Sequence, residues 1–314
     1  MTTYSTLWNP SCTTDAQLRA CIQAYSDGLD AVGVVQTADT GQINIATAVA
    51  PAAPAANTAY LVGYQIRKLE SPGKPTLYLR VRYNIVASTA NTASTYRLSM
   101  DIAASTSTDG NGVLNGVSFI YQLCNFASQT TGPNASVSTT LMRPLYMASD
   151  GGNYLTVISD PAGNAGSGSM KYGYLNFAVE RSINALTGEY DAEAFVGFFP
   201  FSSGTGNTLQ VLNVASSTVA ASGASSYQTP GTLWTTSGSL TQATIMPATV
   251  CVPAPKGPAL ASLLAFAADV TFGGQYQINM YGRLVTYMAV NQVYTASQVN
   301  GIAVNVVTPL LRFD

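Results

Sequence analysis

The sequence predicts a mainly β protein, with an antiparallel β-sandwich or jelly-roll-like body that follows one N-terminal amphipathic helix. Three observations support this fold class: a single clear helix signal near the start, many short segments in which apolar and polar residues alternate, and Gly/Ser/Thr/Asn-rich segments between them. Turn signals at intervals of roughly 8–12 residues are typical of sandwiches and barrels. The chain has 314 residues, 47% of them hydrophobic, which is enough for one large or two ordinary domains with a substantial core.

The predicted helix begins at Thr14. Residues 14–17, Thr-Asp-Ala-Gln, have the form of a capping box, in which the hydroxyl of Thr14 accepts a hydrogen bond from the backbone N–H of Gln17. An apolar stripe at helical spacing follows, made up of Leu18, Cys21, Ile22, Tyr25 and Leu29. Gly28 and Gly33 mark the region where the helix is predicted to end. We therefore expect an amphipathic helix with one face that must pack on something.

A Pro/Ala-rich linker at residues 48–59 is predicted to follow, because its prolines can sustain neither a helix nor a strand ladder. We divide the chain near residue 60, into a docking segment at residues 1–60 and a β body at residues 61–314. Residues 207–246 are rich in Ser, Thr, Ala and Gly and almost free of charge. That composition leaves open a long loop, an insertion, or a boundary between two β units.

The clearest strand lies at residues 76–83, where Leu77, Leu79, Val81 and Tyr83 alternate with Arg80 and Arg82, as expected for a half-buried strand. Further strands are predicted at residues 96–102, 117–123, 154–159, 172–180, 192–199, 208–214, 274–281 and 284–290. Residues 109–112, Asp-Gly-Asn-Gly, predict a tight turn with positive φ angles. The apolar run at residues 259–268 suggests a short second helix.

The charge composition excludes several functional classes. Only 9% of the residues are charged, against about 25% in an average soluble protein. The chain has no histidine, so Ser-His-Asp and Cys-His nucleophile systems, HExxH metal sites and imidazole bases are excluded. With 13 basic and 15 acidic residues, the chain is a poor electrostatic match for nucleic acid or anionic lipid. Residues 1–30 lack a signal-peptide pattern and the longest apolar run is too short to cross a bilayer, so we expect cytoplasmic synthesis without membrane insertion.

The cysteines indicate neither a metal site nor a disulfide framework. Cys12, Cys21, Cys124 and Cys251 form no CxxC pair and match no zinc spacing. We expect buried thiols, the usual state of such residues. No metal and no cofactor is predicted.

The most suggestive polar residues are Glu189, Asp191 and Glu193, which share one face of a predicted strand. Paired carboxylates could serve a glycosidase, and three could bind calcium. The favoured interpretation is an acidic solvent-facing surface beside a hairpin turn at residues 186–189, because nothing nearby marks a sugar cleft.

Other motifs also favour structural interpretations. Residues 109–112 lack the distal Glu of an EF-hand, residues 163–168 lack the lysine of a phosphate loop, and the sequon at residues 134–136 has no export signal. Arg80 and Arg82 indicate a solvated or intersubunit strand face. We predict no catalytic, cofactor-binding or metal-binding residue.

The low charge and the 18 tyrosines point to assembly instead. Interface cores are enriched in Tyr and depleted in Lys and Glu, and a soluble monomer usually carries more charge. A chain whose surface is covered in a permanent assembly needs fewer charges.

Several segments resemble structural proteins of tailed bacteriophages, from the tail and baseplate region. The likeness covers residues 28–44, with the segment VQTADTGQI at 35–43, residues 63–66 (GYQI), the strand at 77–83, and the terminal segments 274–282 and 283–287. The resemblance implies a non-enzymatic, β-sandwich virion component present in several copies, and it transfers no functional residue.

The leading hypothesis is therefore a virion structural protein of the tail, baseplate or fibre, made in the bacterial cytoplasm, which forms homo-oligomers and binds neighbouring virion proteins. One alternative is a tail module that binds a host receptor or glycan through exposed tyrosines. A second alternative is a capsid decoration (cement) protein. An enzymatic role, a depolymerase built on Glu189, Asp191 or Glu193, ranks last.

Overall fold

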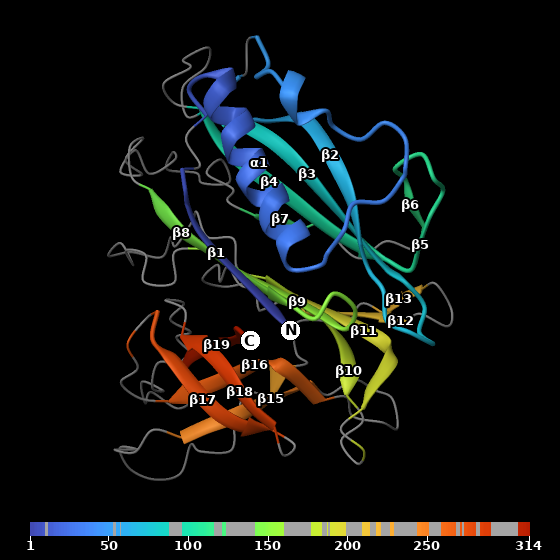
Figure 1. Cartoon of the computed structure of the whole chain (residues 1–314), viewed down its shortest axis with the longest axis vertical. Coiled ribbons are helices and arrows are strands. Elements are labelled where there is room, and N and C mark those ends of the chain that lie inside the picture. The colour runs from blue at the N-terminus through green and yellow to red at the C-terminus, as the bar shows by residue number, and fades with distance from the viewer. Residues whose placement is uncertain are drawn as a thin grey trace, which may run out of the picture.

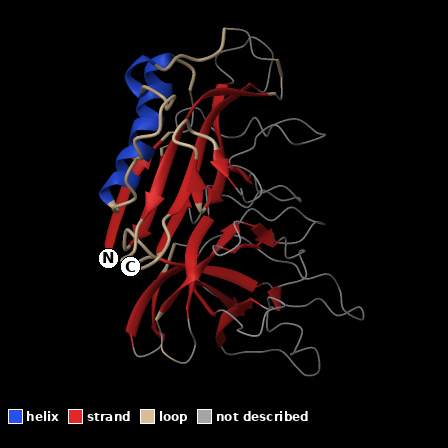
Figure 2. Cartoon of the chain, turned by 90° about the vertical axis from the view of Figure 1, so that its right-hand side faces the viewer, coloured by secondary structure: helices blue, strands red, loops and turns tan. Residues whose placement is uncertain are grey.

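The computed structural model describes residues 1–9, 12–52, 55–56, 58–87, 96–115, 121–123, 142–159, 177–183, 187, 189–198, 209–213, 218–220, 227–228, 244–250, 259–267, 271, 273–280, 283–289 and 307–314. Within these ranges the chain is mainly antiparallel β-structure with a single α-helix near the N-terminus, which confirms the predicted fold class (Figure 1). The helix lies on the outside of the strands, and the two ends of the chain lie close together (Figure 2).

A four-stranded sheet forms the part of the molecule next to the helix. Its order is β2 (Ala59–Leu69), β3 (Leu77–Ala87), β4 (Tyr96–Ser105) and β7 (Tyr121–Leu123). A small hairpin of β5 (Ser107–Thr108) and β6 (Leu114–Asn115) extends from β4. The helix α1 (Asp15–Ala31) covers one face of this sheet, and a 3-10 turn, η1 (Ile45–Thr47), follows it.

A larger, thirteen-stranded sheet contains the remaining described strands. Its main path runs β1 (Thr2–Trp8), β8 (Arg143–Ser149), β9 (Tyr154–Ser159), β10 (Phe177–Ile183), β16 (Ala259–Ala267), β19 (Val307–Arg312), β18 (Arg283–Ala289) and β17 (Gln275–Met280). Two branches leave this path. One is β11 (Tyr190–Phe198), β12 (Leu209–Asn213) and β13 (Thr218–Ala220) from β10, and the other is β15 (Thr244–Val250) and β14 (Tyr227–Gln228) from β16.

The helix begins and ends where the local sequence directs. The hydroxyl of Thr14 accepts a hydrogen bond from the backbone N–H of Gln17 at 3.2 Å, which confirms the N-cap. In a capping box the side-chain oxygen of Gln17 would also accept from the backbone N–H of Thr14. In the structure it accepts from the hydroxyl of Thr13. Gly33, at φ +79°, follows the last turn and donates to the carbonyl of Asp30 at 3.0 Å. A left-handed residue at that point is the usual way to end a helix.

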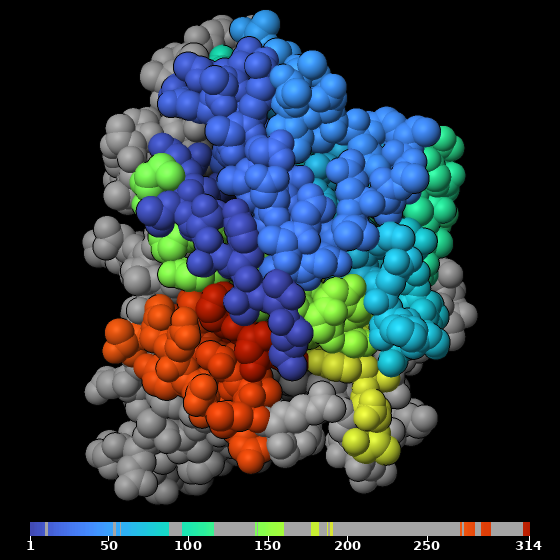
Figure 3. All heavy atoms as spheres, viewed as in Figure 1, coloured from blue at the N-terminus to red at the C-terminus, as the bar shows by residue number. Residues whose placement is uncertain are grey.

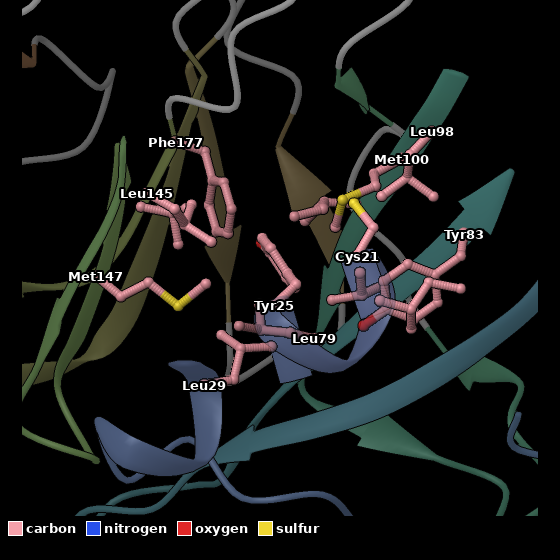
Figure 4. Close-up of a cluster of buried hydrophobic side chains, with 14 of the residues drawn as sticks. Cys21, Tyr25, Leu29, Leu79, Tyr83, Leu98, Met100, Leu145, Met147 and Phe177 are labelled. Atoms are coloured by element: carbon pink, nitrogen blue, oxygen red, sulfur yellow. The ribbon is translucent and has the colours of Figure 1, made fainter. Parts of the chain in front are cut away.

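The apolar stripe of α1 fills the main core. All five of its predicted residues are buried, and they join the four-stranded sheet to the first strands of the large sheet (Figure 4). The side chains of this contact include Cys21, Tyr25 and Leu29 from α1, Leu79, Tyr83, Leu98 and Met100 from β3 and β4, and Leu145, Met147 and Phe177 from β8 and β10. The rings of Tyr25 and Tyr83 meet edge to face with centroids 6.4 Å apart. The apolar face of the helix is therefore occupied within the chain.

The start of the predicted linker is also attached to the helix. The Nε of Arg19 donates to the carbonyl of Ala48 at 2.8 Å, and the backbone N–H of Ala50 donates to the carboxylate of Asp15 at 2.9 Å. The segment ends as β2 begins at Ala59.

Strands β8 to β10 form a layer with both faces covered. Behind the main core, Ile158 and Ala178 pack with Met288 and Leu311 from β18 and β19. All six residues of β9 are buried, as expected for a strand between two packed layers. The described strands therefore stack in layers, with β8–β10 between the α1 side and the β16–β19 side (Figure 1).

The suggested helix at residues 259–268 is wrong. Residues 259–267 are strand β16, which pairs with β15 through contacts such as Met246 opposite Ala265, and with β19 through Leu264 opposite Leu310. A short apolar run has no periodicity that separates a buried strand from a buried helix, and pairing on both sides decides the outcome.

Most other predicted strands agree with the structure within a few residues. The predicted strand at 154–159 coincides with β9, and those at 192–199, 208–214, 274–281 and 284–290 correspond to β11, β12, β17 and β18. The described parts of the strands predicted at 117–123 and 172–180 are β7 and the start of β10. No strand was predicted for β1, β2, β5, β6, β8, β13, β14, β15 or β19, and the start of β2 falls in the predicted linker. Most of residues 207–246 lies outside the described ranges.

Candidate functional site

The three carboxylates do not form a described cluster. Glu189 is exposed between β10 and β11, and its backbone N–H donates to the hydroxyl of Thr187 at 3.3 Å. Asp191 and Glu193 lie on β11, which pairs antiparallel with β10. The antiparallel pairing of these consecutive strands agrees with a hairpin, while residues 186 and 188 of the predicted turn lie outside the described ranges. Within the described residues, no group of three or more acidic, cysteine or histidine side chains is arranged to hold a metal ion.

The predicted turn at residues 109–112 is confirmed. Gly110 and Gly112 have φ angles of +78° and +83°, and the carboxylate of Asp109 accepts from the backbone N–H groups of Asn111 and Val113 at 2.7 and 3.0 Å. These bonds close the β5–β6 hairpin, so the acidic residue has a structural role. Residues 124, 134–136, 163–168 and 251 lie outside the described ranges, while Cys12 and Cys21 are buried thiols.

Two of the segments on which the sequence resemblance rests, residues 35–43 and 63–66, lie side by side. Residues 35–43, here called the edge loop, lie along the outer edge of β2. Three backbone hydrogen bonds join them: Lys68 N–H to Val35 O at 3.0 Å, Thr37 N–H to Ile66 O at 2.9 Å, and Ile43 N–H to Tyr64 O at 2.9 Å. The segments 35–43 and 63–66 are therefore one structural unit, which covers an otherwise open sheet edge.

The side chain of Gln42 fastens the edge loop. Its amide nitrogen donates to the carbonyls of Thr37 and Asp39 at 2.8 and 2.9 Å, and its amide oxygen accepts from the backbone N–H of Ile66 at 2.7 Å. Gly41, at φ +74°, provides the reversal between these contacts. A single amide thus holds both ends of the loop and the adjacent strand.

The carboxylate of Asp39 joins the edge loop to the β5–β6 hairpin. It accepts hydrogen bonds from the hydroxyls of Thr37, at 2.7 Å, and Thr108, and from the backbone N–H of Gly112 at 3.3 Å. Burial alone would raise the pKa of Asp39, but these hydrogen bonds outweigh it and hold the pKa below its ordinary value. The polar residues of the segment are thus used by the fold.

Arg67 lies beneath the edge loop with no exposed surface. Its guanidinium donates to the carboxylate of Asp30, the hydroxyl of Ser26, the carbonyl of Val34 at 3.2 Å and the side chain of Gln65 at 3.1 Å. These bonds fix the C-terminal half of α1 against β2. The two terminal nitrogens of this buried guanidinium thus donate four hydrogen bonds, which stabilise one arrangement of the two elements, while its buried Nε has no partner among the described residues.

Arg80 and Arg82 lie on the face of β3 away from the helix and are half-buried. Arg82 is 3.8 Å from the carboxylate of Asp101, which also accepts from Asn84 at 3.2 Å. Burial, and then the charge of Arg82, lower the pKa of Arg80. Arg80 and Arg82 therefore lie on a partly covered face of the sheet, beside the carboxylate of Asp101.

The tyrosines whose burial is described are all buried or half-buried, and Tyr25, Tyr83, Tyr154 and Tyr287 are completely covered. Burial raises the pKa of Tyr83 and Tyr154 above the ordinary value, as expected for phenols removed from water. The four fully covered tyrosines therefore belong to the core.

The candidate functional surface is the free edge of β1. All seven of its residues pair with β8, from Thr2 opposite Ser149 to Trp8 opposite Arg143, without a register shift. Beyond this ladder its backbone makes no backbone hydrogen bond with the part of the chain that the structure describes. The strand lies on the molecular surface, where it is darkest blue in Figure 3.

The side chains of β1 alternate as an edge strand requires. Tyr4 packs against the main core and Trp8 is buried within it, whereas Thr3, Ser5 and Leu7 are exposed. The period-2 pattern of aromatic and β-branched residues at positions 2–8 was a sequence signal for this strand, and the sequence analysis missed it.

Comparison of the chain with known protein families, curated proteins and solved structures finds no match. Within the described ranges, no helix is both long enough and apolar enough to cross a membrane.

Proposed function

We propose that the chain is a non-enzymatic structural protein of a tailed-bacteriophage particle, of the tail, baseplate or fibres, which assembles with copies of itself and with neighbouring virion proteins. The free, uncharged edge of β1 is the observation that supports this best, because an open strand edge is a template for another chain. The low charge of the chain and its resemblance to virion proteins agree with it.

The geometry of the phage-like segments also supports the proposal. The edge loop and its partner in β2 use their polar side chains to close the fold. A sequence likeness based on such residues reflects a shared folded unit rather than a catalytic site.

Quantitative mass spectrometry of purified particles tests the proposal, with immunogold labelling to locate the chain. We expect several copies per particle, with label on the tail or baseplate. Label on the head would instead indicate capsid decoration, and absence of the chain from particles would refute the proposal.

The enzymatic alternative has a separate test. Capsular or cell-wall polysaccharide incubated with the purified chain should keep its size distribution, and Glu189→Ala and Asp191→Ala should behave like the wild type. Polysaccharide that the wild-type chain shortens, and that either variant leaves intact, would contradict the non-enzymatic assignment.

A further inference from the structure

Within the part of the chain that the structure describes, the edge of β1 lacks the protection that sheet edges normally have. Natural edge strands are blocked by charged side chains, prolines, bulges or a covering segment. The strand β1 contains no charge and no proline, its register with β8 has no bulge, and the first charged side chain of the sequence is Asp15.

The edge of β2 in the same molecule provides an internal comparison. The edge loop covers that strand, which also contains Arg67 and Lys68. Among the described residues, the edge of β2 is therefore covered by the edge loop, whereas the edge of β1 has no covering segment and no charged side chain.

The exposed side chains at this edge are suited to contact. Leu7 is 61% exposed and lies opposite Pro144 in the ladder. Met142, two residues before Pro144, is 49% exposed. Two large apolar side chains are thus exposed near one end of the β1–β8 ladder, and pairing of β1 with another strand would remove part of Leu7 from water.

We propose that β1 pairs antiparallel with β1 of a second copy of this chain, so that the large sheet continues across a two-fold axis. This inference rests on the proposed function and specifies how the chain binds itself. Full overlap of a seven-residue strand with its copy places the axis at Ser5, the middle residue. Leu7 then lies opposite the second copy's Thr3.

Self-pairing fits this strand better than pairing with a charged partner strand would. A two-fold axis brings equivalent residues close together, so any charge in the strand would face its own copy or a near neighbour. A strand without charge pays no such repulsion, and its backbone donors and acceptors are self-complementary in the antiparallel arrangement.

The test introduces charge at the axis. Wild-type chain, Ser5→Lys and Ser5→Glu are compared by light scattering and sedimentation over a concentration series, and Ala20→Lys, at an exposed position of α1, is the control. We expect a wild-type dimer, a dissociation constant raised at least about tenfold in each Ser5 variant, and no change in the control. An equal mixture of Ser5→Lys and Ser5→Glu should restore the dimer.

A second pair of variants tests the register. Thr3→Lys alone should weaken the dimer, and Thr3→Lys combined with Leu7→Glu should restore it, because the axis at Ser5 places these positions opposite each other. Circular dichroism melting of each variant shows whether the fold is retained.

Three results would overturn the inference: a wild-type chain that is monomeric at every concentration, an oligomer that Ser5→Lys leaves intact, or a charge mixture without rescue. None of them bears on the presence of the chain in phage particles. Conversely, absence of the chain from particles would refute the proposed function and leave β1 pairing intact.

Discussion

Replacing Gln42 with Glu changes one functional group of the side chain that holds the edge loop in place. The shape of the side chain and the acceptor for the backbone N–H of Ile66 are kept. The amide nitrogen, which donates to the carbonyls of Thr37 and Asp39 at 2.8 and 2.9 Å, becomes a carboxylate oxygen. At neutral pH that oxygen faces two carbonyl oxygens and has no proton to donate.

The loss in the free energy of unfolding caused by Gln42→Glu has a lower and an upper limit. Two lost hydrogen bonds cost about 1–3 kcal/mol together. The upper limit is set by protonating the new carboxyl, which restores one donor. An ordinary Glu pKa of about 4.3 lies about 2.7 units below pH 7, and each unit costs about 1.36 kcal/mol, so protonation costs about 3.7 kcal/mol. The second bond, still missing, adds about 1 kcal/mol, so the upper limit is about 4.7 kcal/mol. We expect Gln42→Glu to lower the free energy of unfolding by about 2–4 kcal/mol at pH 7.

The pH dependence is the sharper part of this prediction. The site favours the protonated acid, so the folded-state pKa of the new Glu is raised above its unfolded value. Stability from such a group is present below the unfolded pKa and is lost as the pH rises through the folded pKa. The deficit relative to the wild type should therefore shrink to about 1 kcal/mol near pH 4.

Urea unfolding of both proteins at pH 7 and pH 4 measures this difference, with Gln277→Glu at an exposed position of β17 as the control. An equal deficit at the two pH values, or none at pH 7, would show that Gln42 does not fasten the loop through its amide nitrogen.

Three further predictions address the helix, the core and the acid response. Thr14→Ala should lower the free energy of unfolding by about 1 kcal/mol, because the N–H of Gln17 loses its partner, and Thr14→Ser should restore it in chemical denaturation. Ile22→Ala, in the main core, should cost about 2–5 kcal/mol in the same assay, whereas exposed Ala20→Gly should cost about 1 kcal/mol. Burial alone would raise the pKa of Asp150, but hydrogen bonds from Asn153 and neighbouring backbone N–H groups hold it below its ordinary value. A lowered folded-state pKa stabilises above the unfolded value of about 3.9, so the wild type should lose stability as the pH falls below about 4, and melting curves of Asp150→Asn should show a smaller loss.

The edge loop illustrates why function is hard to infer from such a chain. The segment 35–43 is rich in polar residues, and it carries the resemblance described above. Its partners at Ile66, Thr108 and Gly112 are distant in the chain, so only the folded state reveals that these groups are used internally. The candidate surface lies instead on β1, whose residues contain no recognisable motif.

The sequence by itself determined the features that depend on neighbouring residues. The N-cap at Thr14, the apolar stripe of α1, the turn at residues 109–112 and the alternation in β3 each arise from contacts within a few positions along the chain. Local hydrogen bonding and side-chain periodicity are enough to specify them.

Only the tertiary structure decided the features that depend on pairing between distant segments. The run at residues 259–267 became a strand because β15 and β19 flank it, and Arg67 became a buried cation because α1 closes over β2. The edge of β2 is covered and that of β1 is open for the same reason. A strand edge is closed or free according to what the rest of the chain brings beside it, and its own residues do not encode that neighbour.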